Sequence, residues 1–272
     1  MSAGWDAWAR VYRPLEYLAL ARSLEKARAL ALAPPSPGAL PPAGAQWLLL
    51  GDGDGRGLEL LRAHRPRDVF VSLDLSGEML RRARVRSRRG SKHGHPSPRA
   101  GTGSLGLRPG GAPGGSLTAP SPVEWCQADI RRGWPEALAG RTFDAVVSQF
   151  FLDCFTDDEI RGWWSEVAAR LRPGGGWWVT DFTPPEALAG WSAFRQRLIL
   201  ALLYPAFRWT TSMRARTLPD LQRPFRDAGW AEAEKALLPS GICQVVRWRK
   251  PRNTAEEAES VAVESARRPL KK

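Results

Sequence analysis

Cysteine and histidine are scarce in this sequence. Its 272 residues include three cysteines and three histidines. Cys126, Cys154 and Cys243 are widely spaced and form no CxxC pair, which argues against both a disulfide framework and a zinc site. One histidine follows a glycine-rich segment and two lie in a stretch of low complexity, so we expect no histidine nucleophile and no metal site. A reducing compartment, the cytoplasm, fits this composition.

Long apolar runs are also missing. The longest apolar stretch, residues 198–207, is too short to cross a bilayer and is interrupted by a proline. Residues 1–10 lack the apolar run of a signal peptide. We therefore expect a soluble cytoplasmic protein that does not span a membrane.

Acidic residues are absent from the most basic part of the chain. The formal net charge is +12, but residues 81–123 hold nine basic residues and no acidic one, and residues 249–272 contribute a net +3. The rest of the chain is neutral overall. The high charge is therefore a poor guide to the substrate.

The remaining pattern alternates apolar strands with helices. Seven strands are expected, at residues 47–50, 69–73, 123–128, 143–148, 176–180, 230–237 and 242–248. Helices are expected from Gly57, from Gly77 and from Thr156, where Glu159 three residues on completes a capping box. This order predicts a Rossmann-like, doubly wound α/β fold with a mostly parallel seven-stranded sheet and helices on both faces.

One α/β domain is expected over residues 46–250, because the chain is long enough for one sizeable core and has no internal repeat. Residues 1–45 form a predicted N-terminal helical extension, and residues 251–272 a charged flexible tail. Residues 87–121 are rich in Gly, Pro, Ser and Arg and predict a disordered insertion. That insertion is either a tolerated surface feature or a nucleic-acid-binding arm.

The most informative segment is WLLLGDGDGRG at residues 47–57, a strand that runs directly into alternating glycines. Glycines there allow a sharp turn and a close approach of a ligand to the main chain. The dinucleotide fingerprint GxGxxG fails, because its third glycine position falls on Arg56 or Leu58. Asp52 and Asp54 would oppose a pyrophosphate, but they are compatible with a ligand that carries sulfonium and ammonium groups.

A second acidic position follows the next predicted strand. Asp74 lies nineteen residues after Gly55, at a strand end where a carboxylate can accept both hydroxyls of a ribose. Taken alone, Asp74 could equally be the acid at a helix N-terminus. Combined with the glycine loop, it indicates a nucleoside-containing ligand.

These two segments resemble motifs I and II of the class I S-adenosylmethionine (SAM)-dependent methyltransferases. Further segments match the family: QADI at residues 127–130, FDAVVSQFF at 143–151 and LRPGG at 171–175. The resemblance implies SAM as the cofactor, with Asp129 near the adenine amino group. The cofactor-binding residues that it implies are Gly51, Asp52, Gly53, Asp54, Gly55, Asp74, Leu75, Asp129, Ile130 and Gln149.

The chain departs from the family at Leu49, where an acidic residue usually precedes the first loop glycine by two positions. The role of that acid passes to Asp52, or the methionine moiety is held differently. The segment WDAWARVY at residues 5–12 is similar to an FDxxAxxY-like segment that covers the cofactor in many small-molecule methyltransferases. Ordinary helix packing explains this segment about equally well.

Candidate catalytic residues follow the fourth and fifth predicted strands, at the sheet edge where open α/β folds bind ligands. Asp153 ranks first as a base or substrate contact, ahead of Gln149 and Asp181; the alternative is that Asp153 caps the turn before Thr156. The apolar segment 195–213 is an apolar wall over the substrate, a helix packed on the sheet, or a membrane-surface element.

A small, partly apolar acceptor is favoured over nucleic acid. Amino-methylating nucleic-acid enzymes resemble one another in a Pro-Pro motif after the fourth strand, and Ser148-Gln149-Phe150-Phe151 has no proline. Carbon-5 methylators use a Pro-Cys pair, whereas Asp153 precedes Cys154 here. An aminopropyl transferase and a SAM-binding module without catalysis remain alternatives. The acceptor molecule, its reacting atom and the oligomeric state are not predicted.

Overall fold

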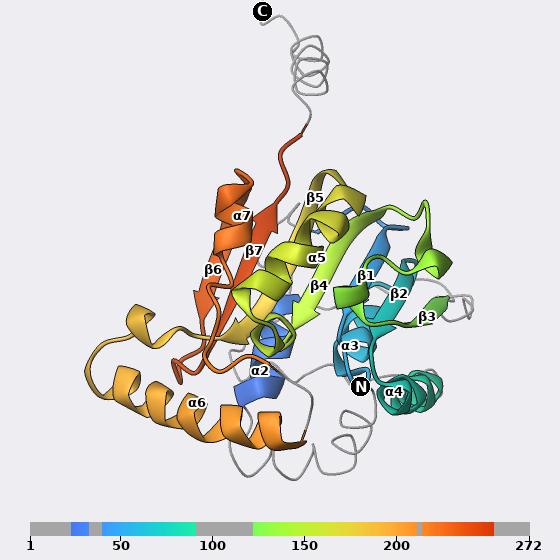
Figure 1. The fold of residues 1–272 in the computed structure, drawn as a ribbon. Coiled ribbons are helices and arrows are strands. Elements are labelled where there is room, and N and C mark those ends of the chain that lie inside the picture. The colour runs from blue at the N-terminus through green and yellow to red at the C-terminus, as the bar shows by residue number, and fades with distance from the viewer. Residues whose placement is uncertain (1–22, 33–39, 91–121, 211–213, 253–272) are drawn as a thin grey trace, which may run out of the picture.

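The computed structural model describes residues 23–32, 40–90, 122–210 and 214–252 (Figure 1). The aromatic segment at residues 5–12, most of the predicted insertion and nearly all of the predicted tail lie outside these ranges. Among the described helices, none is long and apolar enough to cross a membrane.

Seven strands form one sheet in the order β3-β2-β1-β4-β5-β7-β6. Their bounds are β1 Gln46–Leu50, β2 Val69–Asp74, β3 Val123–Gln127, β4 Phe143–Gln149, β5 Leu171–Phe182, β6 Ala231–Leu237 and β7 Cys243–Arg249. Strands β1 to β5 are mutually parallel, whereas β7 runs antiparallel to both β5 and β6. The predicted mostly parallel, seven-stranded sheet is therefore confirmed.

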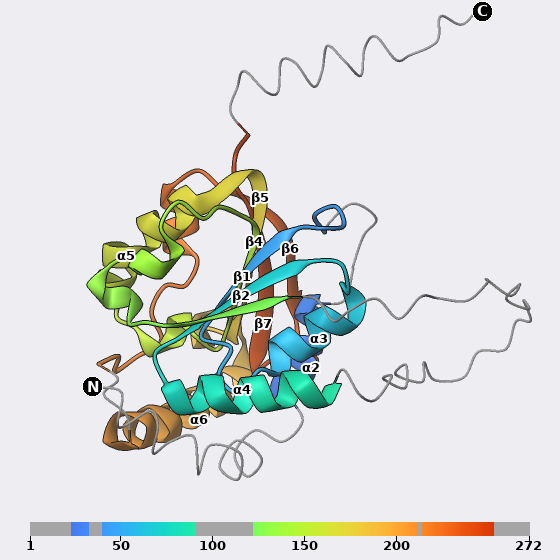
Figure 2. The same ribbon diagram turned by 90° about the vertical axis from the view of Figure 1, so that its right-hand side faces the viewer.

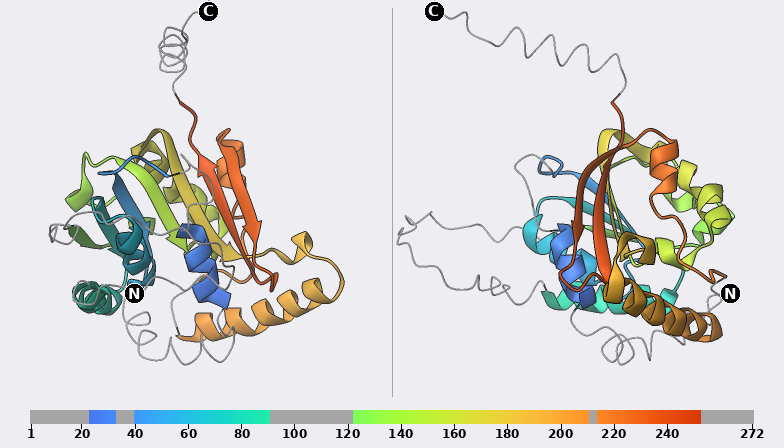
Figure 3. Two further views of the ribbon diagram at one scale, coloured as in Figure 1. Left: turned by 180° about the vertical axis from the view of Figure 1, so that it is seen from behind. Right: turned by 90° about the vertical axis from the view of Figure 1, so that its left-hand side faces the viewer.

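Helices cover both faces of this sheet, as predicted. Figures 2 and 3 show α2 and α3 on one face and α5 and α7 on the other. The helix bounds are α2 Ser23–Leu32, α3 Arg56–His64, α4 Gly77–Gly90, α5 Asp157–Arg170, α6 Gly190–Thr210 and α7 Arg223–Asp227. Short 3-10 turns lie at Ile130–Arg132, Glu136–Leu138, Leu152–Cys154 and Pro185–Ala187.

Strand β1 shows why its sequence is a continuous apolar run. Trp47 and Leu49 pack into the core beneath α2 and α3, whereas Leu48 and Leu50 pack into the core beneath α5 and α7. All four side chains are buried, because successive residues of a strand point to opposite faces and both faces are covered. The strand ends where the glycines begin.

The predicted capping box at the start of α5 is confirmed. The amide of Glu159 donates to Oγ1 of Thr156 at 3.2 Å, and the amide of Thr156 donates to Oε2 of Glu159 at 3.1 Å. The helix ends at Arg170, just before the LRPGG turn. That turn is an irregularity inside β5, so the strand begins earlier than the sequence indicated: Phe143 pairs with Leu171, and Ala145 pairs next with Gly176.

Helix α4 is longer than the sequence indicated. The predicted insertion begins at about residue 87, but α4 continues to Gly90. The rest of that insertion, residues 91–121, falls outside the described residues. Its proposed disorder therefore stays a prediction.

An aromatic cluster forms the centre of the core between the sheet and α5 and α7. Phe225 of α7 is fully buried, stacks on Trp248 with ring centroids 5.0 Å apart, and meets Trp177 edge to face at 5.1 Å. Trp164 and Trp230 also contact Phe225, at 5.4 and 5.6 Å between ring centroids. This one side chain thus joins α7 to α5 and to strands β5 and β7.

We expect Phe225→Ala to lower the free energy of unfolding by about 3–5 kcal/mol, because it leaves a cavity among four aromatic rings. Leu237→Ala is the matched control, since Leu237 is 46% exposed on β6 and should change stability by less than about 0.5 kcal/mol. Urea denaturation of both variants measures the difference. Equal stability of the two variants would show that the cluster is not the centre of the core.

Candidate active site

A cleft opens at the carboxyl ends of β1, β2 and β4, where the order of strands along the chain reverses. It encloses about 940 Å³, including the open space at its mouth. Nine of the ten predicted cofactor-binding residues line it: Gly51, Asp52, Gly53, Asp54, Asp74, Leu75, Asp129, Ile130 and Gln149. The tenth, Gly55, lies at the N-cap of α3, and a Cβ on it would approach the Cβ of Ala83 in α4 to 2.8 Å.

The first loop glycine is required by the geometry. Gly51 has φ +62°, a left-handed conformation that side chains rarely adopt. A Cβ at this position would lie 2.1 Å from Cδ2 of Phe151, whose ring packs directly on the loop. The amide of Gly51 donates to the carbonyl of Leu73 at 2.8 Å, which fixes the start of the loop against β2.

Asp52 caps the helix that follows the loop. Its carboxylate accepts hydrogen bonds from the amides of Gly57 and Leu58, each at 2.9 Å. Burial raises the pKa of Asp52 to about 7, although these two amides and the nearby charge of Arg28 act to lower it. The carboxyl therefore changes its charge near neutral pH, in the wall of the cleft.

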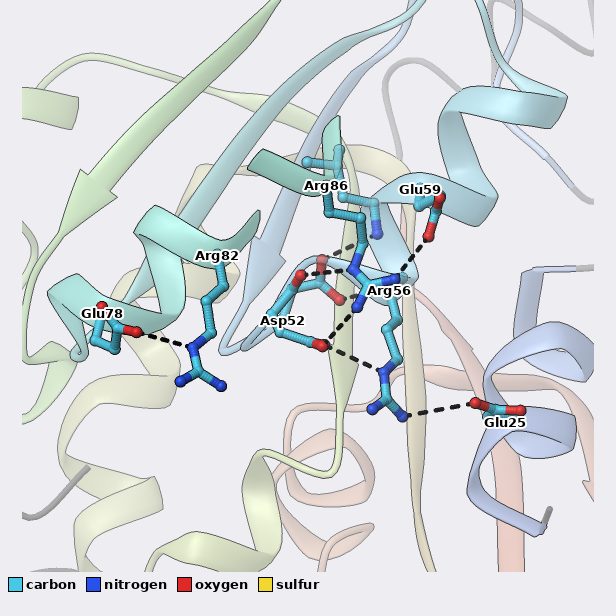
Figure 4. Close-up of polar contacts among 10 residues, drawn as sticks. Glu25, Asp52, Arg56, Glu59, Glu78, Arg82 and Arg86 are labelled. Atoms are coloured by element: carbon cyan, nitrogen blue, oxygen red, sulfur yellow. Dashed lines mark hydrogen bonds and ion pairs between the residues drawn. The ribbon is translucent and has the colours of Figure 1, made fainter. Parts of the chain in front are cut away.

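Asp54 lines the cleft and is paired with two arginines. Arg86 of α4 pairs with Asp54 at 2.7 Å and with Glu59 of α3 at 3.2 Å (Figure 4). Arg56 lies 3.3 Å from Asp54 and 3.8 Å from Glu25 of α2. Three helices are thus joined at the glycine loop, and the two arginines balance the charge of Asp54 within the protein.

Asp74 contacts both the glycine loop and the start of α4. Its Oδ2 accepts from the amide of Gly53 at 3.0 Å, and its Oδ1 accepts from the amide of Ser76 at 2.8 Å. Asp74 therefore lies in the turn before α4, as the interpretation of it as the acid at a helix N-terminus predicted. It also lies in the cleft wall, as the other interpretation required.

Asp129 forms a two-point ion pair that the sequence did not predict. Nε and Nη2 of Arg131 donate to its two carboxylate oxygens, at 2.8 and 2.9 Å. Partial burial acts to raise the pKa of Asp129, but the hydrogen bonds from Arg131 outweigh it and hold that pKa below its usual range. Oδ1 of Asp129 also accepts from the amide of Arg131 at 3.2 Å, so Oδ2 is the oxygen that keeps a lone pair for a ligand.

Gln149, the last residue of β4, has an acceptor without a partner. Its Nε2 donates to the carbonyl of Arg28 at 3.5 Å. Its Oε1 is buried and has no hydrogen-bond partner among the described residues. A Cβ on Gly57 would lie 2.7 Å from this oxygen and 2.5 Å from Oδ1 of Asp52, so the two acceptors lie around the same glycine. A buried oxygen of this kind calls for a donor from a ligand.

Several lining residues were not identified from the sequence. Arg28, on α2, is 7% exposed, and its guanidinium lies 5.0 Å from the centroid of the Phe150 ring. Phe151 and Phe155 continue the aromatic wall, with ring centroids 4.9 Å apart. No sequence pattern signals Arg28, because its position depends on where α2 packs. The phenylalanines follow β4 directly, which is a signal that could have found them.

Asp153, predicted as a base or substrate contact, lies behind this wall. Its side chain is 4% exposed and is not among the residues that line the cleft. Its amide donates to Oδ2 of Asp181 at 3.3 Å, and the amide of Phe182 donates to the other oxygen at 2.9 Å. Burial raises the pKa of Asp153 to about 6, and burial with the adjacent Asp153 carboxyl raises that of Asp181. The pair anchors the loop after β4.

No protein-family model matches the sequence, and no curated protein is significantly similar to it. Solved structures are similar in fold. An O-methyltransferase family protein from Burkholderia thailandensis has a TM-score of 0.56 at 15% identity, over 91% of this chain and 58% of that one. An O-methyltransferase family 2 protein from Planctomyces limnophilus, in complex with apigenin, has a TM-score of 0.58 at 13% identity, over 90% and 62%.

A third similar structure matches over nearly its whole length. It is the methyltransferase in a complex with the Haloferax volcanii Trm112 methyltransferase activator, with a TM-score of 0.59 at 15% identity, over 93% of this chain and 98% of that one. This chain has the methyltransferase fold. The resemblance to class I SAM-dependent methyltransferases is thus confirmed for the fold, whereas the chain spans about three-fifths of the two O-methyltransferases.

We expect Gly51→Ala to destabilise the protein, because a left-handed alanine costs about 1–2 kcal/mol before any clash with Phe151. Gly162→Ala is the matched control: Gly162 lies in α5 with open space around a Cβ, so alanine there should stabilise by about 0.5–1 kcal/mol. Urea denaturation measures the free energy of unfolding, which should fall in Gly51→Ala and rise in Gly162→Ala. A neutral Gly51→Ala variant would contradict the packing of Phe151 on the loop.

Proposed function

We propose that this protein is a SAM-dependent methyltransferase that acts on a small, partly apolar acceptor. One observation carries the proposal. The glycine loop, Asp74, Asp129 and Gln149 are far apart in the sequence and line a single cleft at the reversal of strand order. The free cysteines are consistent with a reducing, cytoplasmic setting for the reaction.

The amino-acid end of SAM fits the part of the cleft near Asp52. An ammonium group there would meet the carboxylate of Asp52 and the partnerless Oε1 of Gln149. Arg28 lines the same cleft and acts electrostatically on Asp52, so it supplies a cation for the carboxylate of the ligand. In this proposal Asp52 replaces the acid that the family has at the position of Leu49.

The nucleoside end fits the opposite set of lining residues. Asp74 would accept the ribose hydroxyls through oxygens that already hold the loop in place. Leu75 and Ile130 offer apolar surface for the adenine ring, and Asp129, fixed by Arg131, lies beside Ile130 for the amino group. Gly55 contributes through the backbone turn at the start of α3.

When bound, SAM supplies a methyl group on a positively charged sulfur, which is already activated for transfer. The protein therefore has to hold the acceptor in line and exclude water. Phe150, Phe151 and Phe155 provide an aromatic wall for this purpose. Burial, together with nearby Asp153 and Asp181, raises the pKa of the Cys154 thiol, so Cys154 stays protonated. Because Asp153 does not line the cleft and its amide donates to Asp181, we assign it to positioning the aromatic loop.

Calorimetric titration with SAM and S-adenosylhomocysteine tests the cofactor. Asp74→Ala should weaken binding at least about tenfold, because it removes charged hydrogen bonds to the ligand. Asp158→Ala removes an exposed carboxylate on α5 and should bind like the parent. Circular dichroism of each variant checks that it is folded. Absence of binding by the folded parent would overturn the proposal.

Binding should depend on pH through Asp52. Its pKa of about 7 means that the ionised form grows as pH rises through neutrality, and the ionised form attracts the ammonium group. Affinity should therefore fall by up to about tenfold per pH unit below 7. Asp52→Asn should bind more weakly at pH 8 and show a flat profile. An unchanged profile in this variant would remove Asp52 from the proposed subsite.

A further inference from the structure

Helix α6 crosses the carboxyl edge of the sheet with its inner face fixed (Figure 1). Gln196 is buried and donates to the carbonyls of Thr183 and Ile242, each at 2.9 Å. Tyr204, also buried, donates from its hydroxyl to the carbonyl of Asp153 at 3.4 Å. The helix is therefore held against the loop that carries the aromatic wall of the cleft.

The outer face of α6 presents a cluster of large apolar side chains. Trp191, Phe194 and Leu198 are 72, 55 and 51% exposed, at the i, i+3 and i+7 spacing of one helical face. The rings of Trp191 and Phe194 lie 5.3 Å apart. The other exposed large apolar residues of the described ranges lie singly, on α2, α4 and β6. A grouped and exposed apolar face of this kind marks an interaction surface.

The segment of chain that carries this face is basic. Residues 187–219 contain five arginines and no acidic residue. Arg197, Arg214 and Arg216 are exposed, and Arg195 donates to the carbonyl of Ser240. The acid nearest in sequence before the helix is Glu186, in the preceding turn. A partner with both an apolar interior and negative charge would match this face.

We propose that α6 docks on the surface of a bilayer that contains anionic lipid. Trp191, Phe194 and Leu198 enter the boundary between headgroups and acyl chains, and the exposed arginines meet the anionic headgroups. Tryptophan is suited to this depth, because its ring is apolar and its N–H is polar. Docking of two copies through this face would bring like-charged arginines together, because a two-fold interface pairs the same surface with itself. The proposal does not depend on methyl transfer.

The full chain is tested by co-sedimentation with vesicles of phosphatidylcholine alone and of phosphatidylcholine mixed with phosphatidylglycerol. The protein should bind the mixed vesicles more strongly, and added salt should weaken that binding. The double variant Trp191→Ser/Phe194→Ser should lower the partition coefficient about tenfold or more, because two large apolar side chains no longer enter the bilayer. Leu237→Ser, which changes an exposed apolar residue on β6, should bind like the parent.

Three results would overturn the proposal. One is absence of vesicle binding by the folded parent, and another is equal binding by the parent and the double variant. The third is a dimer, measured by light scattering without lipid, that the double variant dissociates; this result would assign the face to a second copy. SAM titration of the double variant should be unchanged, so loss of vesicle binding is separable from failure of the cofactor proposal.

Discussion

The order of the strands reverses at β1, and the position of every residue in the cleft depends on this reversal. β1 pairs with β2 on one side and with β4 on the other, so the chain leaves these strands toward opposite sides of the sheet. The crossover connections therefore diverge at the carboxyl end of β1. The space left open there is bordered by Gly51, Asp74 and Gln149, which follow or end the three strands.

Each carboxylate at this edge makes hydrogen bonds or an ion pair that stabilises the fold. Asp52 caps α3, Asp74 holds the amide of Gly53, and Asp54 is bound by Arg86. Several negative charges can share one small cleft because arginines and backbone amides compensate most of them. Asp52 is the exception, since burial raises its pKa to about 7. A cationic group from a ligand would complete its environment.

Local sequence patterns predicted the parts of this site that depend on neighbouring residues. The apolar run of β1, the alternating glycines and the capping box at Thr156 each act within a few residues, and the structure contains all three. Arg28 and Arg131 were missed. The position of Arg28 depends on the packing of α2, and the ion pair of Arg131 depends on the conformation of the turn after β3. Contacts of this kind are not signalled by any hydrophobic period or motif in the sequence.

For Asp153, the sequence predicted the position in the fold but not the surroundings of the side chain. The sequence placed it correctly after β4, but Phe150 has φ +54°, the one positive value of a non-glycine among the described residues. This turn directs Phe150 and Phe151 to the cleft and leaves Asp153 beside Asp181. Burial raises the pKa of both carboxyls, and the neighbouring Asp153 carboxyl raises that of Asp181 further. A conformation costing about 1–3 kcal/mol persists only when its surroundings hold it. The amide of Phe150 donates to the carbonyl of Thr180 at 2.7 Å, and Asp181 accepts from the amide of Asp153 at 3.3 Å, so the end of β5 holds this turn and the aromatic wall that follows it.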